Sequence, residues 1–183
     1  MTDEASRMII HCTHKLSTKL PNVSSTLLTE TNPLGSWHAN LYVIDRRNCV
    51  MFCHDQTRFV LFMAGLKKAD FARFEYWFQD LFANTMLKLG YEPVLIEKTL
   101  GLLDPLKFDT RCDRSVQGSL RTAKMMDLDG LLMDVPDVLD LPIYSVNVRL
   151  NHRPVTTKGM KGRECLWPDR AMLEWIEQVA LHD

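Results

Sequence analysis

The chain of 183 residues is long enough to bury a hydrophobic core without disulfide bonds or a structural metal, and its length suits a single domain. Hydrophobic residues make up 46% and charged residues 25%, as is typical of a soluble globular protein. The 22 basic and 23 acidic side chains give a net charge of −1. This balance excludes a strong overall attraction to nucleic acid or anionic membranes. Electrostatic binding of such partners would need a local basic patch.

The sequence shows no membrane-spanning or secretory segment. It contains no window of about 18 apolar residues. Residues 1–7 are polar and acidic, and only three apolar residues follow before His11, so neither part of a signal peptide is recognisable. We therefore expect a cytoplasmic protein without a membrane partner, whose five cysteines are free thiols in a reducing compartment.

The first part of the chain has the character of strands. Residues 8–13 (MIIHCT) predict a short strand, and a loop rich in Ser, Thr, Asn and Pro follows. Three further strands are predicted at residues 38–44, 49–54 and 58–64. The linkers DRRN and DQT are short enough to join neighbouring strands as hairpins, which predicts an antiparallel β-meander.

Residues 69–89 give the clearest helical pattern, since phenylalanine, leucine and methionine recur on one broad face and Gly90 supplies a stop. Pro93 suits the first position of a second helix, and Asp113 is a good N-cap for a third helix over residues 114–126. Pro168 opens a last helix. These patterns place most of the helical residues after the meander.

Two segments between these helices are less regular. Residues 127–140 are rich in Asp, Leu and Pro and are predicted to form a loop. Residues 141–151 fit a strand by their alternation of Val146, Val148 and Leu150, and fit a helix by the spacing of Ile143, Val146 and Leu150. Both interpretations of residues 141–151 stay open on the pattern alone.

The predicted fold class is α+β. We expect an antiparallel β-meander of three to four strands, packed by the long amphipathic helix at residues 69–89, with a mainly helical C-terminal half. No linker or internal repeat divides the chain, so residues 1–183 are interpreted as one domain. Within it, residues 8–64 are mainly strand and residues 69–181 mainly helical.

The cysteines around the first hairpin suggest packing rather than metal binding. Cys49 and Cys53 share one face of the predicted strand. An extended strand rises about 3.3 Å per residue and holds them roughly 13 Å apart, too far for one ion. We therefore expect no metal and no cofactor, and we expect both thiols to lie in a dry interior shared with the aromatic helix at residues 69–89.

The start of the helix after Asp113 could bind an anion. Arg111 and Arg114 flank Asp113, and Ser115 follows, so free N–H groups, a helix dipole and two guanidinium groups come together. The alternative is that the Asp113 side chain already occupies those donors and that Arg114 pairs with Asp109 or Asp113.

A second candidate site lies at the entry to the meander. Trp37, His38 and Asn40 bring together an aromatic ring, a titratable group and an amide, which together could bind a nucleobase or an amide. The alternative is a buried tryptophan with a hydrogen-bonded asparagine that holds the preceding loop. His38 is the candidate acid or base of this site. The sequence contains no phosphate-binding loop, dinucleotide fingerprint or zinc-protease motif.

Four stretches resemble, in order and spacing, a bacterial family known as domain of unknown function 6933. They are MIIHCTHKL, GSWHANLYVIDRRNCVMFC, TRCDRSVQGSL and RLNHRPV. The resemblance spans the chain from Met8 to the final helix. It implies a cytoplasmic bacterial protein and favours the helical interpretation of residues 141–151. The resemblance brings no established activity with it.

This sequence departs from the family pattern at the third stretch. The pattern there has Asn-Arg-Ser-Val-Leu-Gly-Ser followed by Met-Asn-Asp, whereas Asp113 replaces the first Asn here, and Leu120, Arg121 and Thr122 replace the last three residues. A reaction that needs those amide and carboxylate groups would be lost or altered in this chain.

Two classes of function are consistent with the sequence. The first is a non-enzymatic protein-interaction or regulatory module, which binds a protein partner. The second is a binder of, or an enzyme acting on, a phosphate-containing ligand such as RNA or a nucleotide, with Arg111 and Arg114 as an anion clamp. Convergence on one open cleft would favour the second class, and scattering or full engagement in internal pairs would count against it, for the residues Trp37, His38, Asn40, Arg111 and Arg114.

Overall fold

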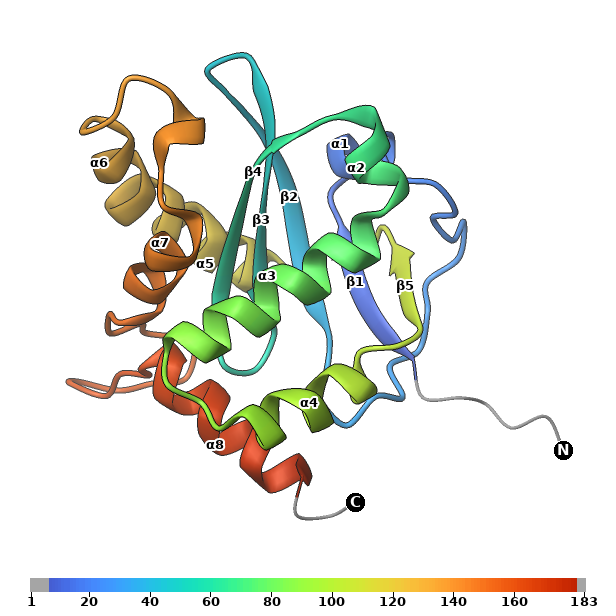
Figure 1. Cartoon of the computed structure of the whole chain (residues 1–183). Helices are drawn as coiled ribbons and strands as arrows, with labels where there is room; N and C mark the ends of the chain where they lie inside the picture. Colours follow the sequence, from blue (N-terminus) through green and yellow to red (C-terminus); the bar gives the residue numbers. More distant parts are fainter. Residues whose placement is uncertain (1–6, 181–183) are drawn as a thin grey trace, which may run out of the picture.

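The computed structural model describes residues 7–180 as a five-stranded sheet with helices on both faces (Figure 1). Residues 1–6 and 181–183 lie outside the described part. Most of the polar amino-terminal stretch and the last residue of the predicted helical half therefore lie outside it as well. The strands are β1 (Met8–Cys12), β2 (Trp37–Ile44), β3 (Arg47–His54), β4 (Val60–Leu66) and β5 (Leu106–Asp109), in the spatial order β4-β3-β2-β1-β5.

The predicted meander is present as β2, β3 and β4, which pair antiparallel in succession. Asp45 and Arg46 close the first hairpin with positive φ angles of 49° and 63°, as a two-residue type I′ turn requires. Two interactions also connect this turn to residues 137–138. The Asp45 carboxylate accepts a hydrogen bond from the Val138 N–H, and the Arg47 guanidinium forms an ion pair with Asp137. The mixed α+β class is therefore confirmed.

The expectation of a purely antiparallel sheet is wrong. β1 pairs parallel with β2 on one side and parallel with β5 on the other. β5 has only four residues, too few for a recognisable period, and the sequence pattern predicts no strand there. The register places Met8 opposite Leu106 and His11 opposite Asp109, so a strand from the predicted helical half completes the sheet.

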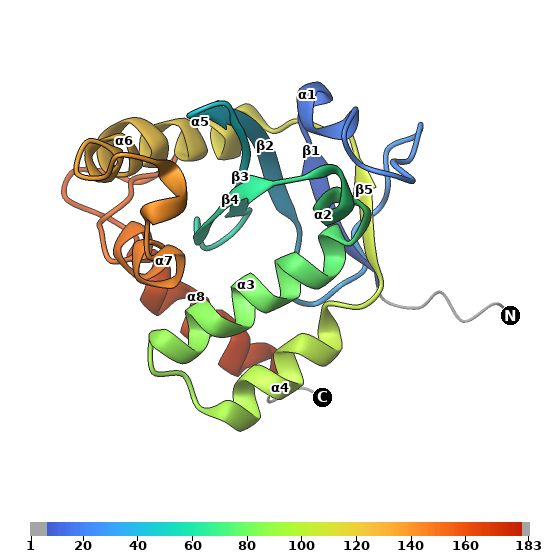
Figure 2. The ribbon, with the colours of Figure 1, turned by 45° about the horizontal axis from the view of Figure 1, so that its top comes forward.

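The helices fall into two groups, one for each face of the sheet (Figure 2). Residues of α3, α4 and α8 join the core on the first face, and α5, η1 and α7 contribute to the core on the second. The helices are α1 (His14–Ser17), α2 (Lys68–Ala72), α3 (Phe74–Lys88), α4 (Pro93–Leu102), α5 (Arg114–Ala123), the π-helix η1 (Lys124–Leu128), α6 (Asp129–Leu132), the 3₁₀ turn η2 (Val138–Asp140), α7 (Ile143–Asn151) and α8 (Pro168–Ala180).

The single helix predicted over residues 69–89 is in fact two helices, α2 and α3. Arg73 breaks the pattern with φ −117° and ψ 31°. Its guanidinium lies 4.6 Å from the centroid of the Tyr76 ring. The break lets Phe71 and Phe74 stack at 6.0 Å and lie buried together.

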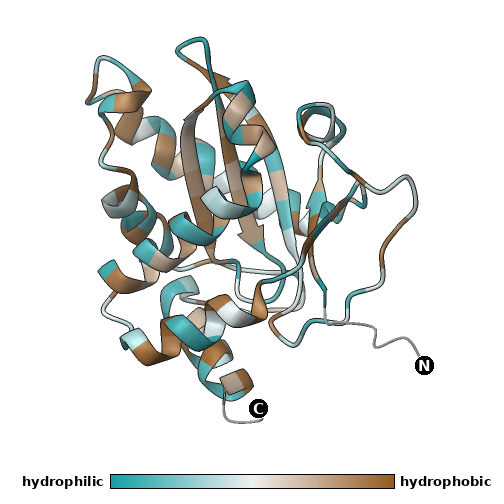
Figure 3. Ribbon diagram, turned by 45° about the vertical axis from the view of Figure 1, so that its right-hand side comes forward, coloured by the Kyte–Doolittle hydropathy of each residue, from teal (hydrophilic) through white to brown (hydrophobic). Residues whose placement is uncertain are grey.

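The first face of the sheet carries the aromatic core. Trp37 of β2 and Phe52 of β3 pack against Phe78 of α3, with ring centroids 5.2 and 5.1 Å apart. Phe78 is completely buried. In Figure 3 the strands are largely brown, whereas the helices carry both brown and teal segments, as expected for elements that bury one side.

Cys49 and Cys53 face the second core, not the aromatic helix. Both are completely buried, together with Met51 of the same strand face, against α5 and α7. Both thiols lie in a dry interior, as expected. The prediction that they share it with the helix at residues 69–89 is wrong, because the helices beside them are α5 and α7. The cause is the alternation of the strand: Val50 and Phe52 point to α3, so Cys49 and Cys53 point away from it.

Residues 127–140 are not the continuous loop that the sequence predicts. The helix α5 runs on through η1 into α6, and η2 follows. Residues 141–151 form the helix α7 rather than a strand. Its two buried asparagines explain the mixed pattern, since Asn147 and Asn151 bond to the outer edge of β4 and so occupy the inner face of the helix.

Among the helices of residues 7–180, none combines the length and the apolar character needed to cross a bilayer.

Candidate functional site

Three polar side chains form a row on the second face of the sheet, where β1 and β5 end. Asp109 of β5 lies opposite His11 of β1, and His11 lies opposite His38 of β2. Because directly paired residues of neighbouring strands point to the same face, these side chains are adjacent. The rings of His11 and His38 are 4.8 Å apart between centroids. The carboxyl ends of parallel strands are a common position for ligand sites.

His11 is oriented by the Asp109 carboxylate. Its Nδ1 lies 2.6 Å from Oδ1 of Asp109, and Asp109 is completely buried. The same carboxylate accepts main-chain N–H groups from Leu28 and Arg111 at 2.9 and 3.1 Å. When the imidazole is neutral and donates its Nδ1–H to this carboxylate, the lone pair of Nε2 is available.

The Nε2 atom of His11 has no hydrogen-bond partner among residues 7–180, and it is not one of the fully buried unpaired atoms of that part of the chain. The whole His11 side chain is 6% exposed. A partly shielded imidazole nitrogen with a free lone pair is the arrangement of a general base.

His38 is held at both ring nitrogens. Its Nδ1 lies 2.7 Å from Oδ1 of Asp55, and its Nε2 is 2.9 Å from the main-chain nitrogen of Asp113. A main-chain N–H can only donate, so Nε2 is the acceptor and Nδ1 carries the proton that is donated to Asp55. In this state His38 anchors the segment before α5 and has no nitrogen left for a ligand.

The segment between β5 and α5 is fixed at both ends by these interactions. Asp109 binds the Arg111 N–H, and His38 binds the Asp113 N–H. Asp113 is the predicted N-cap, since its Oδ1 accepts from the N–H groups of Ser115 and Val116 at 2.8 and 3.1 Å. The bond from Val116, with that from Ser115, lowers the pKa of Asp113 and keeps it ionised.

Arg58 adds a buried positive charge to the histidine cluster, which consists of His11, Asp109, His38 and Asp55. It is 9% exposed, and it donates to the Asp55 carbonyl at 2.7 Å and to the Ser115 hydroxyl at 3.2 Å. Its Nε is buried without a partner, and no carboxylate of residues 7–180 forms an ion pair with it. A buried guanidinium without a paired carboxylate favours a negative charge nearby.

Five of the six residues singled out in the sequence lie on this side of the sheet or at the start of α5. Arg111 and Arg114 are exposed, and within the described ranges neither forms an ion pair with Asp109 or Asp113. Asn40 accepts a hydrogen bond from the Thr13 hydroxyl at 2.9 Å. The five residues are His38, Asn40, Arg111, Arg114 and Ser115.

Trp37 is the exception among the six. It is 1% exposed on the opposite face of the sheet and packs edge-on against Phe78 and Phe82. As neighbours along β2, Trp37 and His38 necessarily point to opposite faces. The indole therefore takes no part in the histidine cluster.

Sequence reasoning missed His11, Asp109, Asp55 and Arg58. One signal was available: His11 interrupts the otherwise apolar strand MIIHC, and a buried polar side chain requires a partner. The partner Asp109 could not be identified, because its strand β5 was not predicted.

A metal centre is not formed by this cluster, since no three His, Cys, Asp or Glu side chains within residues 7–180 gather closely enough to hold an ion. His11 and His38 each engage a separate carboxylate instead.

Comparisons with known proteins place the chain in a family. No curated protein and no solved structure matches it. A family model described as "Domain of unknown function (DUF6933)" matches residues 9–171, which include the histidine cluster and all five strands except Met8, the first residue of β1. The chain belongs to this family of domains.

Proposed function

We propose that the protein, as a cytoplasmic bacterial protein, binds a phosphate-containing ligand beside the segment 110–115 and acts on it by acid–base chemistry. The observation that carries the proposal is the His11–Asp109 pair, in which a carboxylate orients the imidazole and Nε2 stays open. His11 replaces His38 as the candidate base, because both nitrogens of His38 are engaged.

Positive charge beside this pair supports an anionic ligand. Arg111 and Arg114 are exposed and free of ion pairs within the described residues, and the buried Arg58 lies behind Ser115. Arginine is well suited to phosphate, since its guanidinium donates two parallel hydrogen bonds. Because Asp113 occupies the N–H groups of Ser115 and Val116, the guanidinium groups and not the helix terminus supply the recognition.

The chemistry assigned to His11 is proton transfer. Its Nε2 takes the proton of a hydroxyl while the hydroxyl oxygen bonds to phosphorus and the bond to the leaving oxygen breaks. The imidazolium keeps its Nδ1–H bond to Asp109, which stabilises the new positive charge, and it then returns the proton to the leaving oxygen. Asp109 keeps its own position through the N–H groups of Leu28 and Arg111.

The test uses a fluorescein-labelled single-stranded RNA oligonucleotide and a fluorescent adenine nucleotide at fixed salt. We expect the wild type to bind one of these probes, and Arg111→Ala with Arg114→Ala to weaken binding on the order of tenfold. His11→Gln should bind within about twofold of the wild type and lose turnover. Circular dichroism melting controls for folding. Absence of binding by the wild type, or full binding by the double variant, would refute the proposal.

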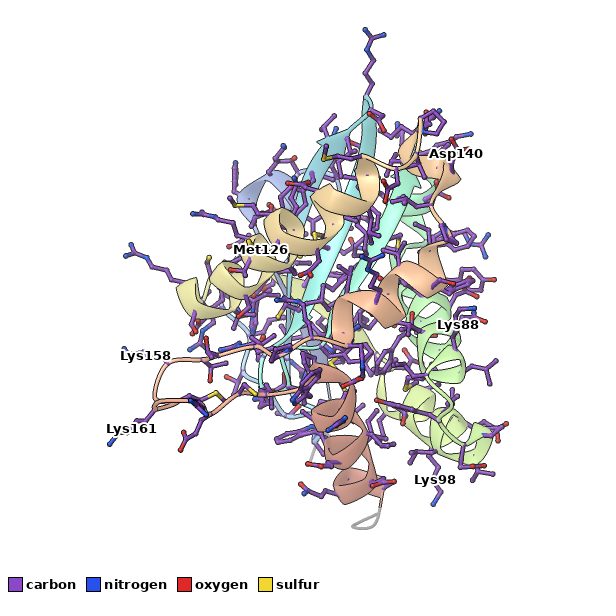
Figure 4. All side chains as sticks on the ribbon, turned by 90° about the vertical axis from the view of Figure 1, so that its left-hand side faces the viewer. Lys88, Lys98, Met126, Asp140, Lys158 and Lys161 are labelled. Carbon is purple, nitrogen blue, oxygen red and sulfur yellow. The ribbon has the colours of Figure 1, made fainter. Side chains whose placement is uncertain are left out.

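A second function, the non-enzymatic interaction module, is favoured by three exposed methionines of η1 and the end of α6. Met125 and Met126 of η1 are 62% and 74% exposed, and Met133 just after α6 is 87% exposed. Figure 4 shows this face, with Met126 on the helix. Methionine is frequent at adaptable protein-binding surfaces. We expect the double variant Met126→Lys with Met133→Lys to lose the capture of a specific partner from the native host. Its melting temperature should equal that of the wild type. Capture of the partner by the double variant would exclude this surface as the binding site.

A further inference from the structure

A cavity of about 360 Å³ lies between the end of β4, α3 and α7, and it is separate from the histidine cluster. Its walls are mainly apolar and include Met63, Leu81 and Ile143. Such a volume is in the range of small-ligand sites. The proposed function does not use this cavity.

Residues 63–66 at the end of β4 form one wall of the cavity. β4 is an edge strand, and the side chain of Asn151 bonds to both main-chain groups of Val60, as that of Asn147 does to Phe62. The register of β3 with β4 shifts between Asn48 and Val50, which pair with Leu66 and Met63, so the regular alternation does not extend through Ala64 and Gly65. The helical position one turn before Asn147 is Ile143, an apolar residue that lines the cavity.

The cavity therefore lies beyond the two asparagine bonds, where α7 presents an apolar residue to β4. Trp77 also lines the cavity, but its Nε1 atom is fully buried and does not face it. The largely apolar walls therefore suit an apolar ligand group.

The charge of the cavity is negative. Asp70 and Asp80 line it, and no Lys, Arg or His does. Asp70 accepts from the Lys67 N–H, and Asp80 accepts from the Tyr144 hydroxyl at 2.9 Å and from the amide of Asn84. Neither carboxylate forms an ion pair with a side chain of residues 7–180. Partial burial and the bond to Asp80 raise the pKa of Tyr144.

The aromatic walls suit a cation as well. Trp77 and Tyr144 present rings to the cavity, and an ammonium group near such a ring is stabilised by its quadrupole. Arg73 places its guanidinium 6.0 Å from the Trp77 ring, but Arg73 does not line the cavity.

We propose that this cavity binds a small organic cation, an ammonium or guanidinium group on a short apolar stem. The cationic head donates to the Asp80 carboxylate, and the stem packs against Met63, Leu81 and Ile143.

The test is titration with 2-phenylethylammonium, followed by ¹H–¹⁵N NMR, with 2-phenylethanol as the neutral ligand of the same shape. We expect shifts at the Ala64 amide and the Trp77 indole N–H, and binding of the alcohol weaker by at least about tenfold. Equal binding of the two compounds, or shifts that spare Ala64 and Trp77, would overturn the proposal.

Asp→Asn variants test the contribution of negative charge, because they remove the charge and keep the shape of the side chain. Asp80→Asn keeps an acceptor for Tyr144 and should weaken amine binding by about tenfold or more, and Asp70→Asn provides a second test if the first variant folds poorly. Asp134→Asn removes an exposed carboxylate outside the cavity and is the matched control. Amine binding that persists in both cavity variants would refute the assignment. Because His11 and Arg111 are intact in every variant, failure here is distinguishable from failure of the proposed function.

Discussion

Asn151 of α7 pairs with Val60 of β4 as a neighbouring strand would. Its Oδ1 accepts from the Val60 N–H at 2.7 Å, and its Nδ2 donates to the Val60 carbonyl at 2.7 Å. Asn147 repeats the arrangement at Phe62, one helical turn earlier. Two asparagines thus cover a sheet edge that would otherwise expose pairing groups.

We predict that Asn151→Leu destabilises the protein by about 2–4 kcal/mol, because a buried N–H and a buried carbonyl of β4 lose their partners. Urea unfolding followed by circular dichroism measures the change. Arg149→Leu, on the exposed side of the same helix, is the control and should alter stability by less than about 0.5 kcal/mol. Equal effects of the two changes would contradict the role given to Asn151.

His54 predicts a specific dependence of stability on pH. Its Nε2 donates to the Leu34 carbonyl and its Nδ1 accepts from Thr57, so the buried ring is neutral. Burial lowers the pKa of His54 from 6.5 to about 4. Between these values the unfolded chain takes up a proton that the folded chain does not, so the unfolding free energy falls as the pH falls from about 6.5 to about 4, by up to about 3 kcal/mol.

This effect of His54 is measured by comparing the wild type with His54→Gln in urea at several pH values. The variant should be less stable at pH 7 and should lose less stability on acidification. Parallel pH profiles for the two proteins would show that another group causes the acid sensitivity.

The five cysteines should divide into two classes of reactivity. Burial raises the pKa of Cys12 and Cys49, and it raises that of Cys53 to about 12. Cys112 and Cys165 are exposed. A thiol-reactive disulfide reagent should therefore label two sites quickly in the native protein and the remaining three only on unfolding. Rapid native labelling of Cys53 would contradict its burial in the second core.

Phe78 should be the most sensitive position of the aromatic core. It is completely buried between Trp37, Phe52 and Phe82. We predict that Phe78→Ala costs about 3–5 kcal/mol and that Phe78→Asp abolishes the cooperative melting transition. Leu87→Ala, on the exposed side of α3, is the control. Native melting of the aspartate variant would show that the core lies elsewhere.

The parts of the fold that follow from local pattern were predictable. The meander of β2, β3 and β4 has short hairpin linkers, and the N-cap Asp113 is a local signal that the structure contains. The helix α7 was ambiguous because Asn147 and Asn151 serve a strand that lies far away in the sequence. β5 was missed because four residues show no period and their pairing partner β1 is distant.

The candidate site was predictable only in part for the same reason. His38, Arg111 and Arg114 were identified because each stands in a locally unusual stretch. His11 acquires its role from Asp109, and that contact depends on parallel pairing across most of the chain. No reasoning from spacing could connect the two residues without knowledge of the sheet order.

The position of β1 between β2 and β5 also affects how a nascent chain matures. On the ribosome, β1 emerges early and β5 much later, so one side of β1 stays a free template for association with other chains until residues 106–109 have left the exit tunnel. Asp109 arrives with β5 and reaches His11 at that moment. Closure of the sheet at β5 and assembly of the imidazole–carboxylate pair thus depend on the same strand pairing.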